Sequence, residues 1–134
     1  MPRGIRNKNP GNIDRTGILW QGMALTQTDP RFCVFTDMFW GIRALGKCLL
    51  TDEDEHDLHT VRQIIDRWAP PTENQTTIYV QDVAKDMGVG TDDQVNLHDH
   101  ANLCSMIEAI SRHENGGDFL VSADVTKGAS LALT

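Results

Sequence analysis

Apolar residues recur at spacings of three and four over much of this 134-residue chain, a pattern typical of helices that bury one face. The pattern predicts five helices, at residues 38–49, 60–68, 78–87, 96–112 and after 122. Thr60 is a favourable cap for the start of the second helix, and Gly88 is a favourable stop for the third. An acidic run at 52–57 follows the first helix, and we expect it to form a solvated loop.

Two short apolar runs ahead of these helices predict a small β-hairpin. Residues 18–20 (Ile-Leu-Trp) and 32–35 (Phe-Cys-Val-Phe) have the composition of strands, and a turn at 28–30 precedes the second run. The predicted fold class is therefore α+β, mainly helical, with a small hairpin. The length is that of one domain with its own core, so residues 1–134 are expected to form a single domain.

The charge of the chain argues against one class of partner. The formal net charge is −7 at pH 7, whereas proteins that bind nucleic acid carry clusters of Lys and Arg that neutralise phosphates. We therefore expect no nucleic acid partner. The sequence also shows no apolar run typical of a signal peptide or a membrane span. We expect synthesis in the cytoplasm without a signal peptide, and no stable membrane insertion.

Glu114 is unusual because it falls at the end of the helix that is predicted to begin near residue 96. The carbonyl end of a helix carries partial negative charge, so cations are the usual occupants of its last turn. That field favours the neutral form of a carboxyl group, which is the form that a general acid needs. Gly116 and Gly117 supply the helix stop. A surface glutamate ahead of a glycine cap is the plainer interpretation.

Several polar and aromatic side chains could bind sugars. The amides of Asn9, Asn12 and Asn74 each offer a donor and an acceptor, as sugar hydroxyl and acetamido groups require. Turn formation is the alternative role for Asn9 and Asn12. Trp20 lies in the polar hairpin and could stack on a sugar ring, whereas the other two tryptophans fall on or beside apolar helix faces, which favours core positions.

Several motifs carry a resemblance that covers nearly the whole chain: RGIRNKNPGNI at 3–13, WQG at 20–22, FCVF at 32–35, GIRAL at 41–45, RWAPPTENQT at 67–76, and Tyr79. They resemble those of small phage and prophage virion proteins that contain a lysozyme-like domain. The chain also resembles bacterial glucosaminidases and lytic transglycosylases, provided that the helix of Glu114 is moved ahead of residue 3. The resemblance implies a lysozyme-like fold, and the order of the motifs indicates a circular permutation.

The resemblance also implies a function, the cleavage of peptidoglycan glycan strands in phage lysis or cell-wall penetration. It makes Glu114 the general acid that protonates the glycosidic oxygen. Tyr79 becomes the residue that lines the cleft and stabilises an oxocarbenium-like transition state. No cofactor is implied. The expected partners are peptidoglycan strands and either virion components or a holin, because a protein made in the cytoplasm reaches the wall by holin release, virion delivery or dedicated secretion.

The sequence does not identify a second catalytic carboxylate. A glycosidase normally needs one at a set distance from the acid, and Asp14, Asp29, Asp37 and Asp118 are all candidates. Without a second carboxylate, a single glutamate could let a hydroxyl group of the muramic acid attack, as in lytic transglycosylases. Muramidase hydrolysis and lytic transglycosylation therefore stay open as alternatives.

Two readings without glycan cleavage complete the alternatives. His98, His100, Cys104 and His113 carry zinc-ligand atoms, and the second and third of them have a four-residue spacing. Four ligands from a single helix are hard to converge on one ion, so we expect no metal. The stronger rival is a non-catalytic virion structural or cell-wall-binding protein that keeps the fold without the chemistry.

Overall fold

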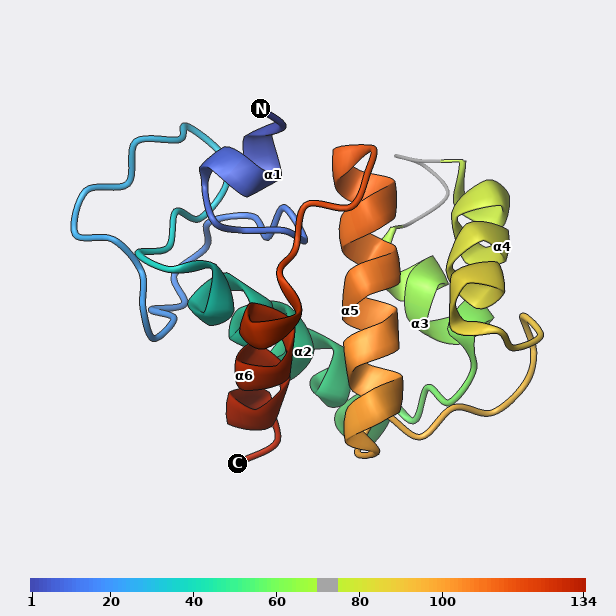
Figure 1. Ribbon diagram of the computed structural model, residues 1–134. Coiled ribbons are helices and arrows are strands. Elements are labelled where there is room, and N and C mark those ends of the chain that lie inside the picture. The colour runs from blue at the N-terminus through green and yellow to red at the C-terminus, as the bar shows by residue number, and fades with distance from the viewer. Residues whose placement is uncertain (70–74) are drawn as a thin grey trace.

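The computed structural model of this protein describes residues 1–69 and 75–134, and these residues form six helices (Figure 1). The helices are α1 (Arg3–Arg6), α2 (Met38–His56), α3 (Val61–Trp68), α4 (Thr76–Met87), α5 (His100–Asn115) and α6 (Ser122–Ala132). Helix α5 lies between two pairs, with α3 and α4 on one side and α2 and α6 on the other. Among the described residues, no helix combines the length and the apolar character needed to cross a membrane.

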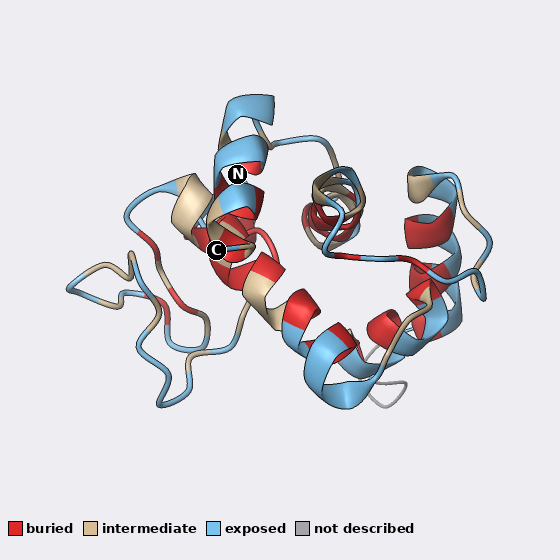
Figure 2. Ribbon diagram, turned by 90° about the horizontal axis from the view of Figure 1, so that it is seen from below, coloured by how far each residue is buried: buried red, intermediate tan, exposed pale blue. Residues whose placement is uncertain are grey.

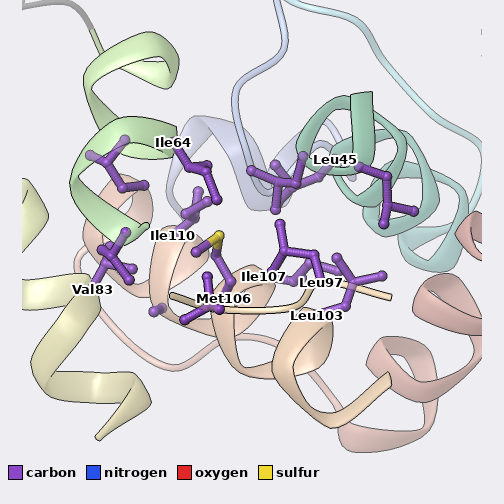
Figure 3. Packing of buried hydrophobic residues seen from close by; sticks show 14 of the residues in the cluster. Leu45, Ile64, Val83, Leu97, Leu103, Met106, Ile107 and Ile110 are labelled. Atoms are coloured by element: carbon purple, nitrogen blue, oxygen red, sulfur yellow. The ribbon is translucent and has the colours of Figure 1, made fainter. Parts of the chain in front are cut away.

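One large apolar cluster connects α2 through α6, and Figure 3 shows its centre. Leu45 of α2, Ile64 of α3 and Val83 of α4 are fully buried there, together with Met106 and Ile110 of α5. Buried residues fall on the inward faces of the helices (Figure 2). The core therefore fixes α5 from both sides, and the position of its last turn follows from that packing.

Local signals set three helix ends where the sequence predicted them. The Thr60 hydroxyl accepts a hydrogen bond from the Gln63 N–H at 3.1 Å, and the Gln63 side chain accepts one from the Thr60 N–H at 3.3 Å, which is a capping box. Gly88 ends α4 at φ 72°, and Gly116 ends α5 at φ 73°. The mainly helical prediction is confirmed.

The start of α5 lies later than predicted. The helix begins at His100 rather than near Asn96, because the side chain of Asp99 caps it by accepting a hydrogen bond from the Asn102 N–H at 3.1 Å. The preceding residues form a turn, in which the Asp99 N–H donates to the Asn96 carbonyl at 3.2 Å.

The acidic run at 52–57 is mostly helical, so the prediction of a solvated loop was wrong. Helix α2 continues through residue 56, and two of its acidic residues are buried with partners. The Arg67 guanidinium donates to Asp52 at 3.1 Å, and the Leu97 N–H donates to Glu53 at 2.7 Å. These hydrogen bonds offset the free-energy cost of burying the two carboxylates. The acidic run therefore continues α2 instead of ending it.

The predicted hairpin, and with it the α+β lysozyme-like fold class, is wrong, because the described residues form an all-helical structure with no sheet. Residues 32–35 do pair, but through single antiparallel bridges to two separate segments, at Asp14 and at Met23. The first two residues of the 18–20 run turn to solvent instead, with Ile18 54% and Leu19 91% exposed. Isolated bridges provide no continuous ladder of hydrogen bonds, so no strand forms.

The N-terminal loop, residues 7–13 after α1, packs closely on α2 at Gly41. This contact leads to a prediction about stability. A Cβ atom at Gly41 would lie 1.9 Å from the Lys8 carbonyl oxygen. We expect the Gly41→Ala variant to lose about 1–3 kcal/mol of unfolding free energy, because the clash outweighs the roughly 1 kcal/mol that alanine gains in helix propensity. Urea unfolding followed by circular dichroism measures the loss.

Gly17 supplies the matched control, since a Cβ atom there would meet nothing within 4 Å. The Gly17→Ala variant should stay within about 0.5 kcal/mol of the wild type. Equal unfolding free energies for both variants would contradict the close contact at Gly41.

Candidate functional site

The last turn of α5 presents Glu114 beside the N-terminal loop. Its neighbour Asn115 is buried and joins the two segments: the side-chain N–H group donates to the Pro10 carbonyl at 2.9 Å and to the Ser111 carbonyl at 2.9 Å. Gly116 then stops the helix. Glu114 is therefore held, half-buried, at the point where the end of the helix meets the loop.

Asn9 shapes the loop from inside. It is fully buried, and its amide nitrogen donates to the carbonyls of Ile13 at 3.0 Å and Cys33 at 2.9 Å. Its amide oxygen accepts a hydrogen bond from the Ile13 N–H at 2.9 Å. With both ends of its amide occupied by backbone, Asn9 holds the loop in shape and does not line the cleft described below.

Asn12 contacts Glu114 directly, donating from its amide nitrogen to the carboxylate at 3.2 Å. Its backbone is in the left-handed region at φ 50°, which asparagine tolerates better than most residues. Its amide oxygen is buried and has no hydrogen-bond partner among the described residues, and the same holds for the amide oxygen of Asn115. A Cβ atom at Gly4 would lie within 2.9 Å of both oxygens, so this glycine leaves room for them.

Tyr79 of α4 approaches Glu114 from the core. The tyrosine is fully buried, and its hydroxyl group has no hydrogen-bond partner among the described residues. Burial raises the pKa of the Tyr79 phenol, and the nearby Glu114 carboxylate raises it further. The ring stacks on His113 with 3.7 Å between centroids. Tyr79 and Glu114 thus lie close together, but Tyr79 lies behind the cleft wall.

An open cleft of about 660 Å³ lies in front of Glu114. Its walls come from the N-terminal loop, from the segment around residue 32, and from the ends of α3 and α5. The described residues that line it are Gly11, Asn12, Ile13, Asp14, Arg31, Phe32, Trp68, Ala69 and Glu114. Two carboxylates, one amide and two aromatic rings therefore face a single space.

The backbone bridge between Asp14 and Phe32 places these two side chains on the cleft. The Cys33 N–H donates to the Ile13 carbonyl at 3.0 Å, so 14 and 32 form an antiparallel pair whose side chains share one face. Arg31 donates to the Asp14 carboxylate at 2.6 Å, and both side chains remain more than half exposed. Asp14 is therefore an accessible carboxylate on the same cleft as Glu114.

The other three candidate carboxylates lie elsewhere. Asp29 accepts hydrogen bonds from Arg3 and Asn7. Asp37 precedes α2, and Asp118 pairs with Arg112 of α5. Of the four, Asp14 alone is among the residues that line the cleft. The sequence offered no means of choosing, because the choice depends on pairing between residues 13–15 and 31–33.

The tryptophans are placed differently from the sequence expectation. Trp20 packs on a small apolar cluster with Phe35 and Trp40 and does not line the cleft. Trp68, which was expected in the core, ends α3 and contributes to the cleft wall while packing partly on the main core. The feature of the sequence that could have indicated this position is that Trp68 is the last residue of its helix. Asn74 lies outside the described residues.

Two of the four residues considered for zinc contact each other, since the Cys104 sulfur lies 3.7 Å from His100 Nδ1. The other two have partners of their own. His98 lies 2.7 Å from an Asp54 oxygen, and His100 lies 3.1 Å from the Ser130 hydroxyl oxygen. His113 stacks on the buried tyrosine described above. These contacts give each ring a role in packing or hydrogen bonding within the helical frame.

A different trio brings ligand atoms close together. Glu53, Asp54 and His98 each place one such atom within 4.8 Å of the others. The Glu53 carboxylate already accepts a hydrogen bond from the Leu97 N–H at 2.7 Å. The Asp54 and His98 side chains bond to each other. The cluster is explained by these contacts and lies apart from the residues that form the cleft.

Sequence comparison relates this chain to a bacteriophage protein. It is 33% identical over 129 residues to Protein P5 of Pseudoalteromonas phage PM2, and the match covers 94% of this chain and 79% of Protein P5. The chain belongs to the Protein P5 family. The phage part of the expected relationship is thereby confirmed. No model of a protein family matches the chain.

In this member of the Protein P5 family, the Arg3–Asp29 pair generates a prediction for pH dependence. Both Asp29 oxygens lie 2.6 Å from Arg3 nitrogens, and the guanidinium holds the pKa of Asp29 well below its usual range. Such a group stabilises the fold above its unfolded pKa of about 4, and the contribution is lost as pH falls below that value. The wild type should lose more stability between pH 6 and pH 3 than Asp29→Asn does, as measured by urea unfolding. Parallel losses in the two proteins would contradict the assignment.

Proposed function

We propose that this protein cuts the glycan strands of peptidoglycan, with Glu114 as general acid, in phage lysis or cell-wall penetration. The observation that carries the proposal is the half-buried carboxyl group of Glu114 on the wall of an open cleft, beside the amide of Asn12. The likeness of the motifs to those of lysozyme-like phage proteins supports the same chemistry, and membership of a phage protein family is compatible with it.

The composition of the cleft suits a carbohydrate. A volume of about 660 Å³ lies within the range of roughly 300–1,000 Å³ that is usual for ligand sites. Trp68 and Phe32 offer apolar ring surfaces for sugar faces. The second N–H group of the Asn12 amide and the carboxylate of Asp14 offer a donor and an acceptor for hydroxyl and acetamido groups. Of the predicted sugar-binding residues, Asn12 is the one retained in this proposal, and Trp68 replaces Trp20 as the stacking residue.

The first chemical step uses Glu114. Its carboxyl group donates a proton to the glycosidic oxygen, the bond from that oxygen to the anomeric carbon breaks, and the electron pair stays with the departing oxygen. Positive charge then develops on the sugar ring. Tyr79 acts as a positioning residue: its buried, neutral hydroxyl group is a donor available to Glu114 once that carboxylate is ionised.

Asp14 supplies the second step in the hydrolytic version of this reaction. Its carboxylate takes a proton from a water molecule, whose oxygen bonds to the anomeric carbon and produces a reducing end. In the alternative version, a muramic acid hydroxyl group attacks the same carbon and returns its proton to Glu114, which gives an anhydro product. The place of Asp14 on the cleft favours hydrolysis.

Delivery to the wall follows from the same proposal. The expected partners are peptidoglycan strands together with either virion components or a holin. The protein would be made in the cytoplasm and would meet its substrate after holin release, virion delivery or dedicated secretion.

The general-acid role is tested with Glu114→Gln, which keeps the shape of the side chain and removes the transferable proton. We expect release of soluble muropeptides from purified sacculi to fall by roughly 10²–10⁴-fold, with an unchanged thermal unfolding curve. Glu108→Gln is the matched control in the same helix, because Glu108 pairs with Arg112 away from the cleft. Mass spectrometry of the products measures both rates.

An inactive wild type that still binds sacculi would replace this proposal with the rival one, a virion structural or wall-binding protein without catalysis. In that case, Glu114→Gln would bind sacculi about as well as the wild type.

The role of Asp14 is tested through the products as well as the rate. The wild type should release muropeptides with reducing ends, and Asp14→Asn should cut their release by roughly 10²-fold or more. Loss of the exposed Asp14–Arg31 pair costs at most about 1 kcal/mol, so the variant should stay folded. Asp118→Asn is the control. Anhydro products at an unaltered rate from Asp14→Asn would establish transglycosylation by Glu114 without Asp14.

A further inference from the structure

The loop at residues 16–28 exposes apolar side chains at one end of the molecule. The segment contains no Asp, Glu, Lys, Arg or His. Ile18, Leu19 and Leu25 are 54%, 91% and 106% exposed. Figure 1 shows the loop projecting on the side opposite α4, and Figure 2 shows the same separation from below. Large apolar side chains turned to solvent along one loop are typical of an interaction surface.

The loop is held in place by hydrogen bonds at its base. The Gln27 side chain donates to the Val34 carbonyl at 2.9 Å and accepts from the Val34 N–H at 2.8 Å. The Thr36 N–H donates to the Gly22 carbonyl at 2.9 Å, and Gly22 packs so closely on Trp40 that a Cβ atom there would lie 2.1 Å from its side chain. The exposure of the leucines is therefore built into an ordered loop.

The part of the sequence that contains this loop differs in charge from the rest of the chain. Residues 1–51 contain seven Lys and Arg against three acidic residues, whereas residues 52–134 contain five against sixteen. Within the basic part, Asp29 is paired with Arg3 and Asp14 with Arg31. The exposed loop thus belongs to a stretch of chain with a net positive charge, although the protein as a whole is acidic.

We propose that this loop docks the protein reversibly on the surface of an anionic lipid bilayer. Leu19 and Leu25 would enter the boundary between headgroups and acyl chains, where apolar side chains on a surface-bound segment gain by leaving water. Lys and Arg of the basic region are attracted by the lipid phosphates. The acidic part of the chain then faces away from the membrane. This inference goes beyond glycan cleavage and does not depend on it.

Flotation with lipid vesicles tests the docking. The probes are vesicles of phosphatidylglycerol and phosphatidylcholine in equal amounts, and vesicles of phosphatidylcholine alone. The wild type should float with the anionic vesicles, and added salt should weaken the association. The double variant Leu19→Ser/Leu25→Ser should reduce the bound fraction by roughly tenfold or more. Ile78→Ser is the control, since Ile78 is a half-exposed apolar residue on α4.

Several results would overturn the proposal. The first is a wild type that stays unbound with anionic vesicles, and the second is a double variant that floats as well as the wild type. The third is equal flotation with both kinds of vesicle, because it would contradict the attraction between the basic region and the anionic lipids. A wild type that dimerises in light scattering, while the double variant stays monomeric and neither floats, would make a second copy of the chain the occupant of the loop.

Digestion of membrane-free sacculi separates this inference from the proposed function. The double variant should match the wild type there, because Leu19 and Leu25 lie outside the cleft.

Discussion

The cleft depends on one buried amide, the side chain of Asn115. It bonds to the Pro10 carbonyl, 105 residues away in the sequence, and to the Ser111 carbonyl one turn back in its own helix. The two bonds fix the end of α5 against the N-terminal loop, and Asn12 thereby reaches Glu114. Removal of a buried partner of this kind leaves carbonyl groups unsatisfied at a cost of about 1–3 kcal/mol, so the junction is both a structural and a positional constraint.

Features of the fold that depend on local physics could be predicted from the sequence. The capping box at Thr60 and the glycine stop at Gly116 involve groups within four residues of each other, so the sequence alone indicates them. The acidic run at 52–57 was misjudged because its partners Arg67 and Leu97 lie far along the chain. The hairpin was misjudged for a related reason, since the partners of the 32–35 run are separate loop segments.

The candidate site, like the fold, could be predicted from the sequence only in part. The sequence indicates Glu114 and Asn12 separately. In the structure, the Asn12 amide nitrogen lies 3.2 Å from a carboxylate oxygen of Glu114. The sequence could not assign Asp14, whose position on the cleft follows from a bridge to Phe32. The apolar period of α3 favours a core position for Trp68, because such a period describes one face of a helix and gives no information about what lies beyond the end of that helix.

The separation between Pro10 and Asn115 also bears on the order of events during folding. Ribosomes make domains from the amino end at roughly 5–20 residues per second, and contacts between distant residues must pay the entropy of closing a long loop. The loop around Pro10 is therefore synthesised well before the turn that completes it. Until Asn115 has left the ribosome, the walls of the cleft are separate pieces of chain. A nascent chain that ends before Asn115 therefore has no complete cleft.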